Sequence, residues 1–243
     1  VVTPDVTLSD LEITSAQDVT FGNLKVSNLA SITNEGKLTL GTGEFKDITI
    51  TSDSADITKI TATGTSNLTT TGALTLETGE FADIIINSGS ADITKITATG
   101  TANLTTAGAL KLGTGEFADI TINSDSAEIT SLKSTGDANL TTAGDLTVGT
   151  GEFAKVTMTS NNGSVGVSNL TSSNNVAINS ENGKTALGTL NVNGTFDVVT
   201  KNLEITTGMN VGGKATITST GNVVVTPDAT LSDLEIKSAQ DVT

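Results

Sequence analysis

A segment of 36 residues, repeated in tandem, limits what this chain can fold into. Residues 43–78 return as residues 79–114 with 28 of 36 positions identical, and a looser third copy covers residues 115–150. A fixed period of this size is typical of repeat architectures, in which each unit buries its apolar side chains only against its neighbours. The tripeptide Gly-Glu-Phe opens each copy, so its phenylalanines lie 36 residues apart, at Phe45, Phe81, Phe117 and Phe153.

Within each repeat the apolar residues alternate with polar ones. One threonine separates Ile48 from Ile50, and another separates Leu74 from Leu76. This period of two is typical of strands with one buried face, and Thr, Ile and Val favour such strands. Gly, Asn, Asp and Ser gather between the apolar runs. We therefore expect strands of four to six residues, joined by corners whose residues tolerate positive φ or bond their own backbone.

The spacing of the apolar pairs predicts two stacked coils in each repeat. Coils of about 18 residues are a normal length for a three-sided parallel β-helix. Ala55 aligns with Leu74, and Leu74 aligns with Ala91. The first of these steps along the chain is longer than the second, so the two coils should be unequal. We predict an all-β, parallel β-solenoid that runs as one continuous domain over residues 1–243, with about 12 coils in every 223 residues.

A second, longer repeat encloses the first. Residues 1–20 recur at 224–243 with two differences, Val6 against Ala229 and Thr14 against Lys237. We interpret the chain as one 223-residue unit of a tandem array followed by the start of the next. A short duplication at the two ends of an ordinary domain is the alternative. Neither end has a visible cap, so we expect copies of the repeat to stack end to end, as a covalent array or as filaments.

Composition excludes several classes of function. The chain has no His, Cys, Trp, Tyr or Arg, and its net charge is −15. This charge argues against binding to nucleic acid or to an anionic membrane. No apolar run reaches the roughly 18 residues of a spanning helix, and the first ten residues do not form a secretory signal. Without His or Cys the usual catalytic triads are excluded, so we expect no enzyme and no cofactor.

Several polar residues are candidates for a functional site. Asp47, Asp53 and Asp56 are close enough in sequence to share a surface, and we interpret them as solvated acidic corners rather than catalytic groups. Neither a calcium-binding nonapeptide nor an EF-hand loop is present, so no metal site is expected. Thr61 and Thr63 resemble the paired threonines of ice-binding solenoids, and Thr97 and Thr99 repeat them, but such pairs recur only once in 36 residues.

Two sets of repeated positions are interpreted as structural. We expect the four phenylalanines to be buried spacers at one corner of the coil. Asn-x-Ser/Thr sequences place asparagines at equivalent repeat positions, and we favour a ladder of asparagines along a corner over glycosylation. These asparagines are Asn67, Asn103 and Asn139, with further sequons at Asn169 and Asn193.

The segments NLTTAGALKLGTGEFADITINSDSAEIT and LEITTGMNVGGKATITSTGNVVV carry a family resemblance. They resemble the β-helical repeats of filamentous-haemagglutinin-type (two-partner secretion) adhesins and related autotransporter passengers of Gram-negative bacteria. The resemblance implies a right-handed parallel β-helix that is exported and displayed as a surface fibre, although the secretion-domain start of that family is missing.

The function expected from this resemblance is that of a non-enzymatic stalk, extracellular or on the cell surface. An adhesive module that recognises a receptor or glycan along one face is the alternative. A carbohydrate-active enzyme is a third class. It would have to cleave an acidic polysaccharide without the arginine that β-helical lyases use.

Overall fold

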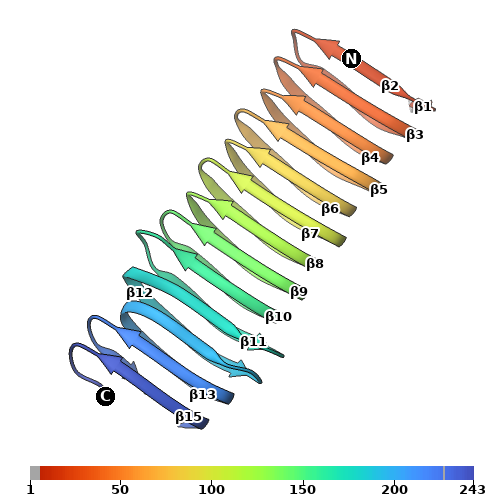
Figure 1. Cartoon of the computed structure of the whole chain (residues 1–243). Coiled ribbons are helices and arrows are strands. Elements are labelled where there is room, and N and C mark those ends of the chain that lie inside the picture. The colour runs from red at the N-terminus through yellow and green to blue at the C-terminus, as the bar shows by residue number, and fades with distance from the viewer. Residues whose placement is uncertain (1–5, 227) are drawn as a thin grey trace. The chain divides into compact units, whose positions relative to one another are not determined.

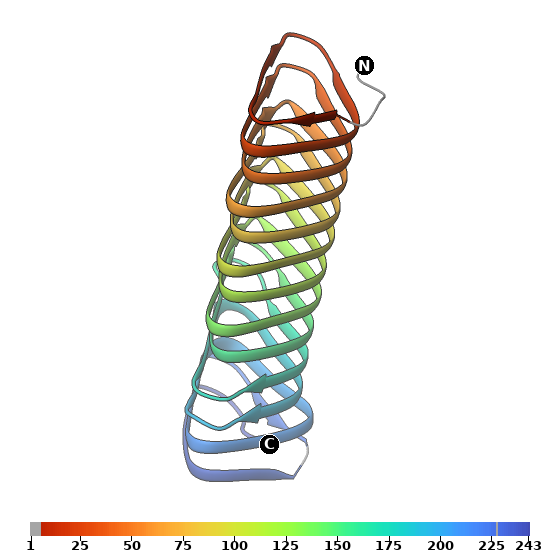
Figure 2. The ribbon, with the colours of Figure 1, turned by 90° about the vertical axis from the view of Figure 1, so that its right-hand side faces the viewer.

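A computed structural model describes residues 6–226 and 228–243 of the chain. Among these residues it shows strands and no helix, with strand making up 85 % of the structure. The chain divides into two compact units, Val1–Ala118 and Asp119–Thr243. Each unit is a stack of parallel coils (Figures 1 and 2). The chain has about 12 turns of about 19 residues. The predicted parallel β-solenoid is therefore confirmed. The hand of the coils and the single continuous domain stay predictions.

Most strands are much longer than predicted, because pairing with the neighbouring coil continues around the corners. Strands of 15 to 17 residues are common, whereas four to six residues had been expected. The strands of the first unit are β1 (Val6–Leu8), β2 (Leu11–Ser15), β3 (Val19–Asn34), β4 (Lys37–Ser52), β5 (Ser54–Thr70), β6 (Ala73–Ser88) and β7 (Ser90–Thr106). The division between the units falls in β8 (Ala109–Ser124). The second unit has β9 (Ser126–Thr142), β10 (Leu146–Ser160), β11 (Val165–Ser172), β12 (Val176–Val192), β13 (Phe196–Ser219), β14 (Val223–Val225) and β15 (Ala229–Ser238).

Each coil has three paired faces. Between β4 and β5 the ladder falls into three runs, which we call face A (37–40), face B (42–45) and face C (48–52), with the same names for equivalent residues of other coils. The predicted inequality of the coils is confirmed, because Ala55 pairs with Leu74 and Leu74 pairs with Ala91.

The inward residues of face B alternate from coil to coil. One coil has a glycine and a phenylalanine, and the next has an isoleucine and an alanine at the same two positions. Gly79 of β6 lies between Ile60 and Ile96, while Phe81 lies between two alanines. A Cβ atom on Gly79 would lie 2.5 Å from Cε2 of Phe81, so the ring occupies the space next to the glycine. The ring is only 4 % exposed. The Gly-Glu-Phe tripeptide therefore lets a large ring fit into a narrow, closely packed core.

Buried hydroxyl groups end face C on successive coils and form a column that was not predicted from the sequence. The alternation of Ile48 and Ile50 continues into Ser52, which also points inward. Thr106 Oγ1 donates a hydrogen bond to the carbonyl of Gly108 at 2.9 Å. The buried Oγ atom of Ser88 has no partner among the described residues, and the same holds for Ser52 and Ser124. Ser88 and Thr106 therefore differ in how well their buried hydroxyl groups are satisfied, whereas Ser160 in β10 donates to the carbonyl of Gly144 at 2.7 Å.

We predict opposite effects for two alanine substitutions in this column. Ser88→Ala should raise the free energy of unfolding by about 1 kcal/mol, because it removes a buried hydroxyl that lacks a partner. Thr106→Ala should lower it by about 1 kcal/mol, because it deletes the hydrogen bond to Gly108 and leaves a small void. Urea unfolding of the two variants tests this. A clear loss of stability in Ser88→Ala would contradict it.

The corners between faces B and C are built by aspartates. Of the two roles expected for corner residues, bonding to the nearby backbone does occur, as from Thr70 Oγ1 to the carbonyl of Gly72, whereas positive φ does not occur among the described residues. No described residue has positive φ, so corner glycines are not used for that conformation. Instead, Asp83 Oδ1 accepts a hydrogen bond from the Thr101 backbone N–H at 2.7 Å, and a Cβ atom on Gly100 would lie 2.3 Å from that oxygen. The glycine makes room for the carboxylate. The same bond recurs from Thr65 N–H to Asp47 and from Asp137 N–H to Asp119.

Candidate binding groove

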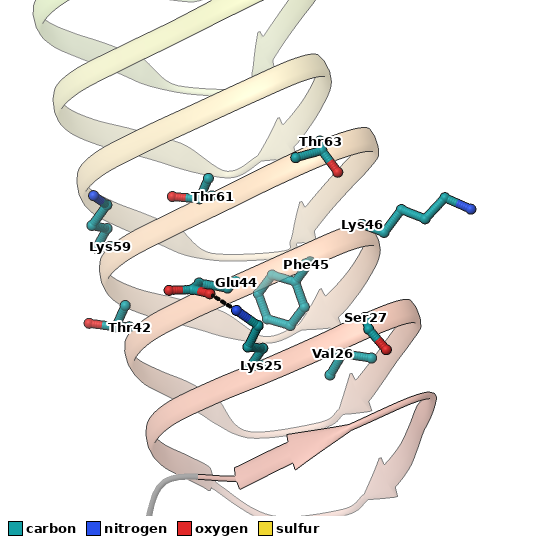
Figure 3. Close-up of a pocket in the computed structure, with 10 residues that line it drawn as sticks. All are labelled: Lys25, Val26, Ser27, Thr42, Glu44, Phe45, Lys46, Lys59, Thr61 and Thr63. Carbon is teal, nitrogen blue, oxygen red and sulfur yellow. Dashed lines mark hydrogen bonds and ion pairs between the residues drawn. The ribbon is translucent and has the colours of Figure 1, made fainter.

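A shallow groove of about 350 Å³ lies on the outer side of face B in the first unit (Figure 3). Three successive strands, β3, β4 and β5, supply its walls, and the buried side chains of Val26 and Phe45 lie beneath it. Its lining residues are Lys25, Val26, Ser27, Thr42, Glu44, Phe45, Lys46, Lys59, Thr61 and Thr63.

The outward residues of face B alternate in chemical type from one coil to the next. Glu44 lies in the ladder between Lys25 on one side and Thr61 on the other. In the neighbouring column Thr42 pairs with Lys59. In the sequence, this surface corresponds to the tripeptide Thr-Gly-Glu in one coil and to Lys-Ile-Thr in the next. From the sequence, Thr61 and Thr63 stand out as a pair, whereas their charged neighbours become neighbours only through the ladder.

Each lysine of the groove is paired with a carboxylate. Lys25 Nζ lies 2.6 Å from Glu44 Oε2, and Figure 3 shows this pair at the centre of the groove. Lys59 pairs with Glu80 at 3.4 Å, and Lys46, which points away from the other labelled side chains, pairs with Asp47 at 4.0 Å. All three lysine side chains are about half exposed, so these pairs exchange readily with solvent and contribute little to stability.

The chemistry of the groove is that of a polar contact surface. The hydrogen bond from Lys25, together with its charge, lowers the pKa of Glu44 below the usual 4.5, with a smaller contribution from the charge of Lys59. Glu44 is therefore a weaker base than an ordinary glutamate. What the groove offers to a ligand is hydroxyl groups and exposed ammonium groups, arranged on a rigid ladder.

We predict a pH-dependent contribution from the ion pair of Lys25 and Glu44. Because the folded-state pKa of Glu44 is lowered, its contribution is present above the unfolded value near 4.5 and is lost as the pH falls through the folded pKa. Glu44→Gln should therefore lower Tm slightly at neutral pH, and the difference from the wild type should shrink as the pH falls below 4.5 and vanish below the folded-state pKa of Glu44.

Glu116→Gln is the matched control for this measurement. Glu116 occupies the equivalent position in β8, and no ion pair of Glu116 occurs among the described residues. Thermal unfolding of both variants across this pH range gives the comparison. An equal and pH-independent effect in the two variants would contradict the assignment to the ion pair.

The three aspartates considered in the sequence do not form a site. Asp47 lies at a corner between faces B and C, while Asp53 lies at the corner after face C and accepts a hydrogen bond from the Thr71 hydroxyl. Asp56 lies on face A and pairs with Lys37 at 3.1 Å. The prediction that all three share a surface was wrong, because Asp47 and Asp53 lie at different corners of the coil and Asp56 lies on face A. No cluster of acidic residues suited to a metal ion occurs in the described part of the chain.

The repeated asparagines lie on the flat outer side of face C rather than at a corner. Asn67 is flanked in the ladder by Thr49 and Ile85, and Asn103 follows Ile85 on the next coil. Asn139 is likewise followed by Thr157. The predicted asparagine ladder along a corner was therefore wrong, since alternate coils place another residue between the asparagines.

The phenylalanines and the threonine pairs are also placed by the structure. Phe45, Phe81, Phe117 and Phe153 are 4–5 % exposed, and Phe45, Phe81 and Phe153 end the face B runs of their ladders. An aspartate follows two residues after each of the first three, whereas Lys155 takes this position after Phe153. Thr61 lies between Glu44 and Glu80 in the ladder, and Thr97 lies next to Glu80. Glutamates on alternate coils thus interrupt the threonine array that an ice-binding surface would need.

Comparison of the chain with known protein families, with curated proteins and with solved structures gave no match. In the described residues, no helix is long and apolar enough to cross a membrane.

Proposed function

We propose that this chain is a non-enzymatic structural segment, the stalk of a secreted or cell-surface bacterial fibre of the adhesin type. The observation that supports this proposal best is the ladder of backbone pairing between successive coils. Each of β4 to β7 pairs with its neighbour over three faces in a fixed register, so hydrogen bonding is repeated in every coil. Such pairing gives a length and stiffness that grow with the number of repeats.

The outer side chains support the same proposal. Seven of the ion pairs found in the described residues link one coil to the next rather than residues within a coil. The aspartate corners add a further bond between coils. The remaining negative charge, −15 in total, should keep neighbouring fibres apart, and salt should weaken that effect.

Deleting one 223-residue unit from the parent protein tests the stalk. The shortened protein should reach less far from the cell while it still binds its ligand with unchanged affinity. Electron microscopy measures the reach, and a cell-binding assay measures the affinity. An unchanged reach after the deletion would contradict the proposal that this chain is a stalk.

An adhesive module is the second candidate, and the groove on face B favours it. Lys25 and Lys59 present exposed ammonium groups beside threonine hydroxyls, which suits an anionic glycan or an acidic peptide. Binding of the wild-type chain to an array of sulfated glycans, reduced in the Lys25→Gln and Lys59→Gln variants, would support this candidate. Lys201→Gln, in the second unit, is the matched control. Equal binding by all variants would exclude the groove as the binding site.

A further inference from the structure

Face C differs from the other two faces in its charge. Over the described coils from β3 to β7 it carries no charged side chain, whereas face B has Lys25 and Glu44 and face A has Asp56. On a chain with a net charge of −15, this is the face on which a second copy meets the least repulsion. Its outward residues form two columns along the ladder, a first of Ser31, Thr49, Asn67, Ile85 and Asn103, and a second of Thr33, Thr51, Thr69, Asn87 and Thr105.

One large apolar side chain projects from these two polar columns. Ile85 in β6 is 39 % exposed, and Asn67 and Asn103 flank it in the ladder. The neighbouring copies of the repeat have threonine at the equivalent position, as Thr49 and Thr121. The repeat therefore folds with a threonine here, so packing within the coil does not explain the isoleucine.

A shallow hollow of about 300 Å³ lies along the edge of face C, at the same coil as Ile85 and the coils on either side of it. The hydroxyl groups of Thr70, Thr71 and Thr106, which help to line the hollow, donate hydrogen bonds within the chain. The hollow therefore presents mainly carbon to the solvent, which suits an apolar side chain. Its lining also includes Thr69, Asn87, Gly89, Thr105 and Ala107.

We propose that two copies of this chain pair side by side through face C of the first unit, about a two-fold axis that runs parallel to the stack of coils. Ile85 and Gly89 lie two residues before and two residues after Asn87, in the same coil. An axis that passes beside Asn87 would therefore bring Ile85 of each copy to the hollow of the other. Such an isologous contact uses the same patch on both copies.

This pairing rests on the proposed stalk function and deepens it. A two-fold axis parallel to the stack leaves both chains pointing in the same direction. This is the orientation that two stalks displayed on one surface would have. The partner is thus a second stalk, and the paired fibre would be thicker and stiffer than a single one.

The second column of face C fits this symmetry. In the paired arrangement each residue of this column meets its own counterpart, so Asn87 faces Asn87 and Thr69 faces Thr69. Amide and hydroxyl groups each offer a donor and an acceptor, so each is able to bond to a copy of itself. Asn87 is exposed on β6 and available for this contact. A carboxylate at the same place would have no donor and would repel its counterpart.

The size of face C sets the strength of the contact. At about 3.3 Å per residue and about 4.8 Å between strands, five residues in each coil from β3 to β7 cover about 400 Å². A standard interface buries about 800 Å² per partner, so we expect a weak, reversible dimer. Salt should strengthen it by screening carboxylates at the borders of the face, such as Asp47 and Asp53. The charges on faces A and B should stop the association at two copies.

Removal of the projecting isoleucine gives the first test. Sedimentation velocity of the natural sequence up to about 1 mM protein should show a reversible dimer. Ile85→Thr should weaken this dimer about tenfold, and it introduces the residue that the neighbouring repeats already carry. Val199→Thr is the matched control, since Val199 is 38 % exposed and lies in the second unit. A monomer at every concentration, or an equal loss in both variants, would overturn the proposal.

A single added charge gives the second test. Asn87→Asp would place two carboxylates opposite each other at the axis, so the dimer should be lost at low salt. Thr78→Asp adds the same charge on face B, where Lys59 and Lys95 flank Thr78 in the ladder, and should leave the dimer intact. Equal effects of the two variants would show that net charge, and not face C, controls the association.

Cysteine crosslinking tests the parallel orientation. The natural chain has no cysteine, so an engineered thiol acts alone. Thr69→Cys should form disulfide dimers by itself as concentration rises, whereas Thr75→Cys, on face A, should not. Antiparallel pairing about Asn87 would instead crosslink a mixture of the Thr69→Cys and Thr105→Cys proteins, because these residues flank Asn87 in the ladder. That result, or equal crosslinking of Thr75→Cys, would overturn the proposed arrangement.

The outcome of these tests is separate from that of the deletion experiment on reach. A single stalk still shortens when a unit is deleted. Loss of pairing together with a reach that still depends on length would therefore overturn this inference alone.

Discussion

Removing the ring of Phe81 should lower the free energy of unfolding by about 3–5 kcal/mol, the range measured for large-to-small substitutions in closely packed cores. The ring is 4 % exposed and lies between alanines of the coils on either side. Those neighbours have no atoms to fill the space that Phe81→Ala would leave. Denaturant unfolding monitored by circular dichroism measures the loss.

The companion substitution tests why the glycine is present. Gly79→Ile should be at least as damaging, because even a Cβ atom would lie 2.5 Å from the Phe81 ring. The double variant Gly79→Ile/Phe81→Ala recreates the Ile-x-Ala pair that β5 and β7 carry at these positions, and it nearly conserves volume. We expect it to recover at least half of the summed losses. Strictly additive effects would show that the two positions do not share one space.

The parts of the fold that depend on local patterns were predictable. Alternation such as Ile48-Thr-Ile50 reports which side of a strand is buried, and one strand of a coil resembles the next because it must stack on it. The unequal steps between coils follow from matching Ala55 with Leu74 and Leu74 with Ala91, since a shift by a single position would place apolar side chains in solvent.

The parts that depend on contacts between coils were not predictable in the same way. Gly100 looks like a residue chosen for its conformational freedom, but its role is set by a carboxylate from the coil before it. The residues next to Gly100 in the sequence do not indicate a contact with Asp83, because Asp83 belongs to the preceding coil. The groove has the same origin, because Lys25, Glu44 and Thr61 are separated in the chain and become neighbours only through the register of three coils.

We also expect a large loss of stability when a corner aspartate is removed. Asp83→Ala removes the acceptor for the Thr101 N–H and should lower the free energy of unfolding by about 1.5–2 kcal/mol, at the lower end for bonds to charged groups because the corner is exposed to water. Asp92→Ala is the matched control, since Asp92 lies exposed on face A of β7 and should change stability by less than about 0.5 kcal/mol.

Gly100→Ala should imitate the loss of the aspartate. The added Cβ atom would lie 2.3 Å from Asp83 Oδ1, so the carboxylate has to move and give up its bond to Thr101. No described residue has positive φ, so the backbone of Gly100 itself accepts an alanine without strain. The loss in Gly100→Ala should therefore disappear once Asp83 is already alanine, apart from a tight contact with the Ala82 carbonyl at 3.1 Å. A double-mutant cycle measures this coupling, and a full loss in the Asp83→Ala background would show that the glycine serves the backbone and not the carboxylate.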